Sequence, residues 1–234
     1  MIVASFWVHR PEEFPNAADY PAMLRILQRS CGRLGLRHIV LTDQATRLLP
    51  SWPCGDDGQS IEARIFDLPS PLMKAVTLAQ AHWLWRFEPE IEDNRTFFVG
   101  ADCILLKKPK AKSGAHVTVT YRHAGANYPI NTGAILINKP GKAVRALFDG
   151  IADRCGERWG DDQRAIRDAL RPLPDGYGIH HRAGGLAIDF SPMWPLNYCP
   201  RDEADPADGA VMVHFRGQRR KDLLFEWAKR HGFY

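Results

Sequence analysis

The sequence lacks an apolar run long enough to cross a bilayer and lacks a cysteine framework. A spanning helix needs about 18 consecutive apolar residues, whereas the most apolar stretch, residues 96–106, is shorter and contains Gly100 and Asp102. The first apolar segment, residues 2–8, has no basic region before it and no cleavage site after it, so it does not resemble a signal peptide. The five cysteines are odd in number and show no CxxC spacing, which argues against a disulfide scaffold and a structural zinc site. These absences predict a cytoplasmic protein without a membrane span.

The sequence also has little excess of charge of either sign. Lys and Arg number 31 against 27 Asp and Glu, which gives a net charge of +4. Such a mild excess suits a phosphate-bearing ligand without requiring one. With 45% hydrophobic and 25% charged residues, the composition is that of a globular protein and excludes collagen-like and disordered classes. The length of 234 residues and the absence of internal repeats predict a single domain over residues 1–234.

Short apolar segments alternate with amphipathic ones along most of the chain. Strand-like segments lie at 2–8, 38–42, 63–68, 96–106, 116–121, 132–138 and 210–215. Helical spacing of apolar residues occurs at 23–34, 72–87, 144–155, 165–170 and 223–228. This alternation predicts an α/β fold with a mainly parallel central sheet flanked by helices.

Residues 173–209 differ in character from the rest of the chain. They are rich in Pro, Gly and Asp and hold only brief apolar pieces. Loop-rich segments of this length are usually binding or lid segments. We expect this segment near the acceptor side of a substrate site.

Asp102 is the most informative single residue. An ionised carboxylate inside an apolar strand costs several kcal/mol unless it is paired, hydrogen-bonded or bound to a metal. Gly100, two residues earlier, is typical of a bulge or of close approach by a ligand. The alternative is a carboxylate that caps neighbouring amides at the end of the strand.

His214 ends the last apolar segment and precedes a glycine and a basic cluster. The cluster comprises Gly217, Arg219, Arg220 and Lys221. A glycine lets the backbone approach a diphosphate, and the cations supply charge-assisted hydrogen bonds. The alternatives are a buried core histidine and a solvated basic loop.

Two further polar groups stand at the edges of predicted elements. Asp161, Asp162 and Gln163 open a helix, where capping alone explains one aspartate more easily than all three residues. Asn131, Thr132 and Gly133 precede a buried strand and suit the binding of sugar hydroxyls, with an ordinary turn as the alternative.

Taken in order, four segments resemble the motifs of nucleotide-diphospho-sugar glycosyltransferases of the GT-A fold, and among these most closely family 8, whose members are retaining enzymes. The segments are FFVGADCILLKKP, NTGAILIN, GDDQRAI and VMVHFRGQRRK, which together lie within residues 96–221. They stand where the family has its DxD metal motif, an N-x-G strand, a D-Q pair at a helix start and a late H-F-x-G-x-x-K motif.

The resemblance implies a divalent ion, Mn²⁺ or Mg²⁺, bound by Asp102 and His214. It also shows two departures. Gly100 stands where the family has the first aspartate of DxD, and the lysine of the late motif falls on Arg220, with Lys221 one step on. The pair that the metal needs most is kept, and its affinity is expected to be reduced.

By the same resemblance, Asp162 binds sugar hydroxyls and Gln163 lies near the anomeric carbon as the catalytic pair. Asp161 is then the expected helix cap. Asn131, Thr132, Gly133, Gly217, Arg219, Arg220 and Lys221 would bind the donor. The expected activity is metal-dependent, retaining transfer of a sugar from a nucleotide-diphosphate sugar to an acceptor that the sequence does not specify. The expected donor is a UDP-sugar.

Two alternatives stay open at this stage. Gly100 is compatible with a nucleotide-sugar-binding protein whose catalysis is weakened. The basic net charge is compatible with a phage-type transferase that glycosylates modified DNA bases, in which case nucleic acid is the acceptor.

Overall fold

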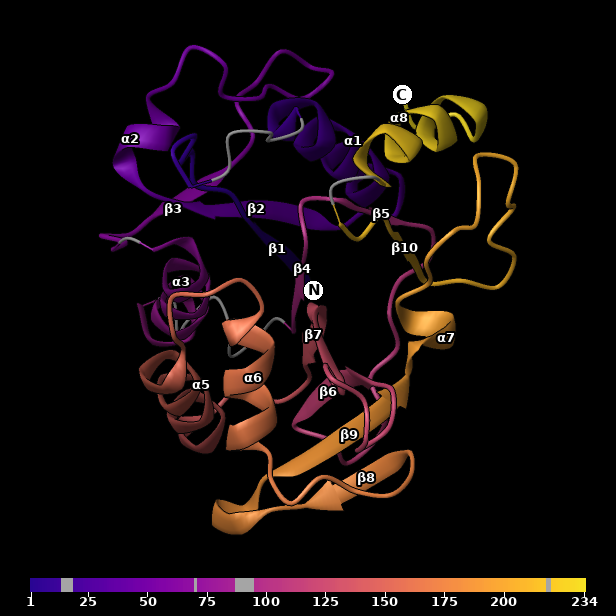
Figure 1. Ribbon diagram of the computed structural model, residues 1–234. Coiled ribbons are helices and arrows are strands. Elements are labelled where there is room, and N and C mark those ends of the chain that lie inside the picture. Colours follow the sequence, from indigo (N-terminus) through magenta and orange to yellow (C-terminus); the bar gives the residue numbers. More distant parts are fainter. Residues whose placement is uncertain (14–18, 70, 87–94, 218–219) are drawn as a thin grey trace.

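The computed structural model describes residues 1–13, 19–69, 71–86, 95–217 and 220–234. Figure 1 shows the arrangement of the elements. The strands are β1 (Ile2–Phe6), β2 (Arg37–Thr42), β3 (Ala63–Ile65), β4 (Thr96–Val99), β5 (Cys103–Leu105), β6 (Val117–Tyr121), β7 (Ile130–Ile137), β8 (Gly178–His181), β9 (Ala187–Pro192) and β10 (Met212–His214). The α-helices are α1 (Tyr20–Arg33), α2 (Gln44–Arg47), α3 (Leu72–Arg86), α5 (Lys142–Arg154), α6 (Asp161–Ala169), α7 (Met193–Leu196) and α8 (Lys221–Arg230), and a short 3-10 helix lies at Ala183–Gly185.

Eight of the described strands form one central sheet in the order β3-β2-β1-β4-β7-β6-β9-β8. Four of its seven pairings are parallel, namely β2 with β3, β1 with β2, β1 with β4, and β6 with β9. The other three are antiparallel. The predicted α/β class, with a mainly parallel sheet flanked by helices, is confirmed.

Alternation along the central strands gives the sheet an apolar surface on both sides. In β1, Ile2 and Ala4 pack with Ala79 and Trp83 of α3 in one cluster. Val3 packs in a second cluster with α1 on the other side of the sheet. Figure 1 shows α3, α5 and α6 grouped together, with α1 and α8 gathered in a separate group. The sheet is therefore enclosed between two helical layers.

The apolar stretch 96–106 is two strands rather than one, which corrects the expectation. The chain turns at residues 100–102, and β5 leaves the central sheet to pair antiparallel with β10 in a sheet of two strands. Both strands are fully buried, so the hydrophobic pattern does not reveal the break. The turn sets His214 opposite Cys103, and the amide of Phe215 donates to the carbonyl of Asp102 at 3.0 Å.

The loop-rich segment 173–209 contains more regular structure than its composition indicates. It includes β8 and β9, and β9 pairs with β6 inside the central sheet. Buried Asp189 of β9 accepts a hydrogen bond from Lys112 at 2.8 Å. The segment therefore builds one end of the sheet before it continues toward the last strand, β10.

Among the described helices, none is long and apolar enough to span a bilayer. All five cysteines are free thiols.

Candidate active site

A cleft of about 860 Å³ opens where β1 and β4 end. This volume is typical of sites that take a small molecule or cofactor, and its place at the carboxyl ends of parallel strands is where open α/β sheets bind ligands. The cleft collects nearly all of the residues predicted from the sequence: Asp102, Asn131, Thr132, Gly133, Asp162, Gln163, His214, Gly217, Arg220 and Lys221. Arg219 lies outside the described residues.

Asp102 is held between two basic side chains. Its Oδ2 lies 2.7 Å from Nζ of Lys221, and its Oδ1 lies 3.3 Å from Nε2 of His214. Burial by itself would raise the pKa of the Asp102 carboxyl, but His214 and Lys221 together hold that pKa well below its ordinary value. The carboxylate is therefore ionised at neutral pH and has a partner on each oxygen.

The imidazole of His214 is oriented by a chain of amides. Its Nδ1 lies 3.0 Å from Oδ1 of Asn197, and Nδ2 of Asn197 donates to Oδ1 of Asn131 at 2.9 Å. The same Asn131 oxygen accepts the backbone amide of Gly133 at 3.0 Å. Since that oxygen accepts both bonds, Asn197 turns its own carbonyl oxygen to Nδ1, and Nε2 is the ring nitrogen that faces Asp102. No local sequence pattern indicates Asn197, which lies in the loop-rich segment.

Gly100 and Gly133 are needed because the site has no room for a side chain at either position. A Cβ atom on Gly100 would lie 2.4 Å from Oδ1 of Asp102, and one on Gly133 would lie 2.2 Å from Cε1 of His214. Both distances are far below van der Waals contact. Close packing around the Asp102 and His214 pair therefore selects glycine at these two positions.

Cys103 lies beside the same pair and was not predicted as a site residue. Its Sγ, a carboxylate oxygen of Asp102 and a ring nitrogen of His214 all lie within 4.8 Å of one another, so these three side chains could hold a metal ion. Burial raises the pKa of the Cys103 thiol well above its ordinary value. The thiol lies 3.9 Å from the carbonyl oxygen of Gly133, at the long end of sulfur hydrogen bonds. In the sequence, its position directly after Asp102 was the available indication that Cys103 lies at the site.

Asp162, in the first turn of α6, is a second buried carboxylate with a different environment. Its Oδ2 accepts a hydrogen bond from the hydroxyl of Thr132 at 2.6 Å. Burial raises the pKa of Asp162, and the bond from Thr132 only partly opposes that effect. Gln163 follows in the same turn, and both side chains line the cleft.

The start of α6 also corrects one expectation. Asp161, expected as the helix cap, is the first helical residue, and Gly160 with φ 84° is the N-cap. Asp161 instead accepts the backbone amide of Arg158 at 2.9 Å and pairs with Arg164 at 2.5 Å. Glycine holds the cap position because its backbone conformation there is left-handed.

The two cations in the described part of the basic cluster make contacts within the protein and also line the cleft. Arg220 donates from Nη1 to the carbonyl oxygen of Pro200 at 2.6 Å while lining the cleft. Lys221 is the first residue of α8 and reaches Asp102. Gly217 adopts φ 81°, a backbone conformation that favours glycine.

Two aromatic side chains line the cleft near α6 and were not predicted. Trp159 is 62% exposed although it is a large apolar side chain. Its ring meets that of Tyr128 edge to face, with centroids 6.3 Å apart. An exposed tryptophan beside a cleft is a common feature of ligand sites. Its position immediately before the Gly160 cap was the only sequence signal.

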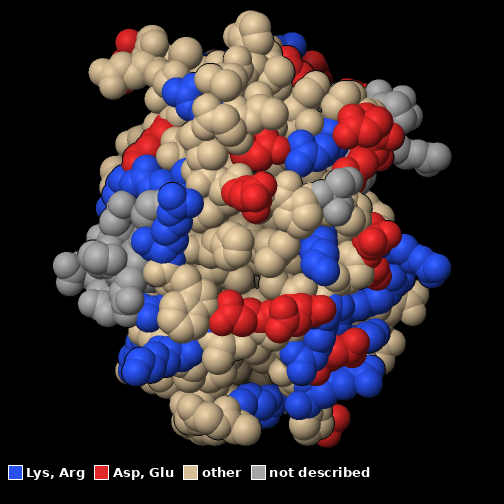
Figure 2. Space-filling view, turned by 90° about the vertical axis from the view of Figure 1, so that its left-hand side faces the viewer, with Lys and Arg blue, Asp and Glu red and all other residues tan. Residues whose placement is uncertain are grey.

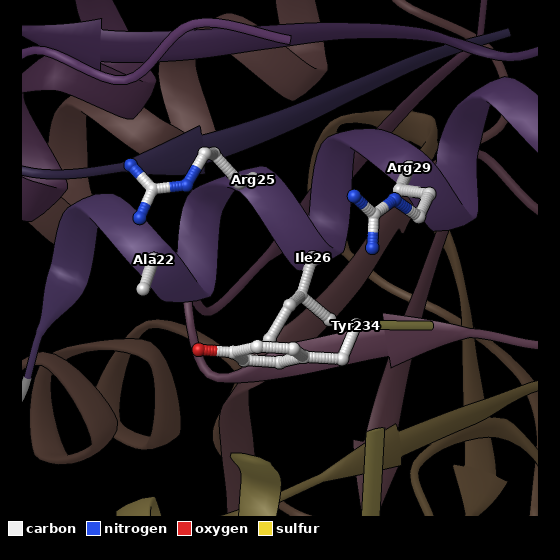
Figure 3. Close-up of a pocket in the computed structure, with 5 residues that line it drawn as sticks. All are labelled: Ala22, Arg25, Ile26, Arg29 and Tyr234. Atoms are coloured by element: carbon white, nitrogen blue, oxygen red, sulfur yellow. The ribbon is translucent and has the colours of Figure 1, made fainter. Parts of the chain in front are cut away.

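A second, smaller hollow of about 220 Å³ lies between α1 and the C-terminus, away from the residues described above. Figure 3 shows Arg25 and Arg29 projecting from α1 above the ring of Tyr234. Arg29 is engaged by Asp56 at 2.6 Å and by the carbonyl oxygen of Phe233 at 3.0 Å. These bonds give the hollow a structural role in fixing the C-terminal end.

Charged side chains of both signs share the face shown in Figure 2. Lys and Arg gather in places but are interleaved with Asp and Glu around an uncharged central area. Among the described residues of α6, Arg167 pairs with Asp168 at 2.8 Å, and Arg171 just beyond the helix approaches the same carboxylate at 3.4 Å. The described residues of this face do not form the continuous basic stripe that is typical of nucleic-acid binding.

No protein-family model and no curated protein sequence matches the chain. Solved structures do match its fold. A glycosyltransferase involved in glycosylation of the major capsid of PBCV-1 has a TM-score of 0.55 at 13% identity, over 96% of this chain and 100% of the other. The glycosyltransferase GlyE of Streptococcus pneumoniae TIGR4 has a TM-score of 0.55 at 11% identity, over 97% of this chain and 60% of GlyE. The galactosyltransferase LgtC in complex with donor and acceptor sugar analogs has a TM-score of 0.51 at 11% identity, over 98% of this chain and 100% of LgtC. The chain therefore has the fold of these glycosyltransferases, which confirms the expected GT-A architecture.

Proposed function

We propose that this protein is a retaining glycosyltransferase that moves a sugar from a nucleoside diphosphate sugar to an acceptor hydroxyl. A UDP-sugar is the donor we propose. The observation that carries the proposal is the cleft itself. It combines a carboxylate at Asp102, held by Lys221 and His214, with a second buried carboxylate at Asp162. It does so in a fold shared with glycosyltransferases.

In this proposal the basic side of the cleft binds the diphosphate. Lys221 and Arg220 face the cleft and supply positive charge, and Gly217 leaves the backbone open to close approach. Cations placed where negative charge develops on the departing diphosphate lower the barrier to its departure. Binding and leaving-group stabilisation therefore use the same side chains.

The sugar is proposed to lie against Asp162, Gln163 and Thr132. Because Thr132 donates only to one oxygen of Asp162, the carboxylate keeps acceptor capacity for sugar hydroxyls. Asn131 and Gly133 shape this wall through the bond between the Asn131 side chain and the Gly133 amide. These two residues position the site more than they contact the sugar.

The proposed reaction breaks the bond between the anomeric carbon and the diphosphate oxygen and forms a bond from the acceptor oxygen on the same face. The acceptor hydroxyl passes its proton to the departing diphosphate oxygen, so the reaction balances without a further reactant. An amide is a poor nucleophile. Gln163 is therefore proposed to steady an oxocarbenium-like species by its carbonyl dipole rather than to form a covalent bond.

The acceptor is proposed to bind beside Trp159 and Tyr128. Trp159 is exposed and Tyr128 is half-buried, and both line the cleft near α6; aromatic rings suit the apolar side of a sugar ring. The loop-rich segment 173–209, which supplies Cys199 to the cleft wall, is proposed to lie on the same acceptor side. The free thiols fit the cytoplasm as the proposed compartment.

The divalent ion expected from the resemblance, Mn²⁺ or Mg²⁺, finds a poor fit among the described residues. Asp102 and His214 direct ligand atoms at one point, but Lys221 already neutralises the one carboxylate. Hard divalent ions prefer several oxygen ligands and net negative charge. The proposed reaction therefore contains no step through a metal ion.

A donor panel tests the function. Purified protein is incubated with UDP-, GDP- and CDP-sugars, and release of nucleoside diphosphate and transfer to sugars or to DNA with modified bases are followed by mass spectrometry. We expect slow hydrolysis of one UDP-sugar and its loss in Asp162→Asn. Tight donor binding with neither hydrolysis nor transfer would instead identify a binding protein with weakened catalysis.

A further inference from the structure

The diphosphate side of the cleft offers too little negative charge for a resident divalent ion. Where the resemblance expects a second aspartate, this chain has Gly100. A Cβ on that glycine would lie 2.4 Å from Oδ1 of Asp102, so no larger residue fits without moving the carboxylate. Among the described residues grouped at this point, Asp102 is the single carboxylate.

The thiol of Cys103 does not make up for the missing carboxylate. Its Sγ lies 3.9 Å from the carbonyl oxygen of Gly133. Sulfur is a soft ligand that suits zinc, copper and iron–sulfur clusters, whereas Mn²⁺ and Mg²⁺ prefer oxygen ligands. The group therefore comprises one carboxylate, one imidazole and one thiol.

Lys221 places a fixed positive charge beside Asp102. Its Nζ lies 2.7 Å from Oδ2, and its side chain is only 9% exposed. The ammonium also lies 5.1 Å from the centre of the Tyr20 ring, a cation–π contact. A lysine fixed in this way neutralises Asp102 and repels a second cation at the same carboxylate.

The helix that carries Lys221 anchors it firmly. Lys221 begins α8, and Leu224 and Trp227 of that helix are buried in a cluster with Phe215 and α1. The ammonium is thus set by the fold rather than by a mobile surface side chain. On the opposite side, the bond from His214 to Asn197 fixes the imidazole that supports Asp102.

We propose that the Lys221 ammonium replaces the divalent ion as the cation that binds the donor's diphosphate, so that nucleotide binding is independent of metal. This inference rests on the proposed function. An ammonium has three N–H donors, and one of them goes to Asp102. The others would donate to phosphate oxygens, since Lys221 lines the cleft. Asp102 and His214 act as positioning residues that hold the ammonium in place.

Titration calorimetry of the full chain with UDP as the probe tests this directly. Wild-type protein should bind UDP with the same dissociation constant, within about twofold (0.4 kcal/mol), in EDTA and in Mn²⁺. Lys221→Met, which keeps the length of the side chain and removes its charge, should weaken binding in EDTA by about tenfold or more. The matched control is Lys142→Met, an exposed lysine at the start of α5 outside the cleft, which should bind as wild type.

A second measurement does not depend on any variant. The electron paramagnetic resonance signal of free Mn²⁺ should stay unchanged when the donor-free wild-type protein is added. Depletion of that signal, or UDP binding that requires Mn²⁺, would overturn the inference and leave the proposed function intact. No binding of UDP, GDP or CDP in either buffer would overturn both.

Discussion

The two buried carboxylates of the cleft, Asp102 and Asp162, have opposite electrostatic surroundings. Asp102 has Lys221 on one oxygen and His214 on the other, and its pKa lies well below the ordinary value. Asp162 has a neutral hydroxyl, that of Thr132, and burial raises its pKa. The fold thus places the ammonium of Lys221 beside one carboxylate and a neutral hydroxyl beside the other.

This difference separates two tasks. A carboxylate with an ammonium on one oxygen and an imidazole on the other is a structural support, since both oxygens have partners before any ligand arrives. A buried carboxylate with a hydroxyl and backbone amides but no cation is costly, and such costs are typical of functional sites. We therefore assign Asp102 to holding a cation and Asp162 to the substrate, and the following substitutions test that division.

The largest effect is expected for Asp102→Asn. Removal of this charge leaves the ammonium of Lys221, 9% exposed, without its carboxylate. Breaking a buried ion pair from one side costs about 3–5 kcal/mol. Urea denaturation at pH 7 should show a loss at the lower end of that range, because neither side chain is fully buried.

A double variant supplies the control. Asp102→Asn with Lys221→Met removes both charges and should recover part of the lost stability, which gives a coupling energy between the two sites. The exposed ion pair of Arg167 and Asp168 provides the matched comparison. Asp168→Asn should change stability by less than about 0.5 kcal/mol. If the double variant is as unstable as the sum of the single ones, Asp102 does not act through Lys221.

Asp162→Asn should act on turnover and not on stability. The turnover number should fall about a hundredfold, which corresponds to 2.7 kcal/mol, while the dissociation constant for donor changes little. An interaction made mainly in the transition state has this signature. Stability should be unchanged or improved, because the variant removes a buried charge that lacks a cation.

Its neighbour is the control. Asp161→Asn loses the ion pair with Arg164 and keeps one side-chain oxygen that can accept the Arg158 amide, so it should cost no more than about 1 kcal/mol of stability and leave turnover within a factor of about two. If Asp161→Asn abolishes transfer and Asp162→Asn is harmless, the two aspartates have the reverse roles.

Gly100→Ala sharpens the comparison by disturbing only Asp102. The added Cβ would lie 2.4 Å from Oδ1, and the carboxylate must move away from His214. Overpacking of this kind costs about 1–3 kcal/mol, and UDP affinity should fall with it. Gly176→Ala, where a Cβ meets nothing within 4 Å, should be neutral in both thermal unfolding and calorimetry.

The two carboxylates should respond to pH in opposite directions. The folded pKa of Asp102 is depressed, so its stabilisation is present above the unfolded pKa of about 3.9 and is lost as pH falls below it. The folded pKa of Asp162 is raised, so its stabilisation is present at low pH and is lost as pH rises through that value. Thermal unfolding measured between pH 7 and pH 3 should show the difference in melting temperature between wild type and Asp102→Asn becoming smaller as the pH falls. Over the same range, the melting temperature of Asp162→Asn should decrease relative to that of wild type. Melting temperatures that change in parallel with pH for all three proteins would contradict this assignment.

Much of the fold and most of the site could be predicted from the sequence. Alternating apolar segments and helical spacing suffice for the sheet and its helices, because each element buries an apolar face. The positions of Asp102, His214 and Asp162 beside such segments place them at strand or helix ends. That they meet in one cleft follows from the common edge of the sheet.

Other features follow from contacts that no local pattern encodes. Asn197 lies in a segment without periodicity, yet it orients His214. Strands β4 and β5 are both buried but belong to two different sheets, so hydrophobicity does not reveal the turn at Gly100 between them. The pairing of Asp102 with Lys221 joins residues from β5 and α8 regions far apart in the chain, and only the packing of α8 brings them together.

The smallest effect is expected for Arg220→Ala, and it tests whether the cations of the cleft are equivalent. By the resemblance, Arg220 holds the position of the motif's lysine, but the structure commits its Nη1 to the carbonyl oxygen of Pro200 at 2.6 Å. Lys221 is the cation fixed to Asp102. We therefore expect Arg220→Ala to raise the dissociation constant for UDP by about fivefold, near 1 kcal/mol, and by less at high salt, because a charge that acts over a distance is screened. Arg220→Lys should recover most of that loss, since it keeps the charge and gives up the Pro200 contact. Calorimetry at two salt concentrations measures both values, and a loss in Arg220→Ala equal to that in Lys221→Met would show that the fixed ammonium has no special role.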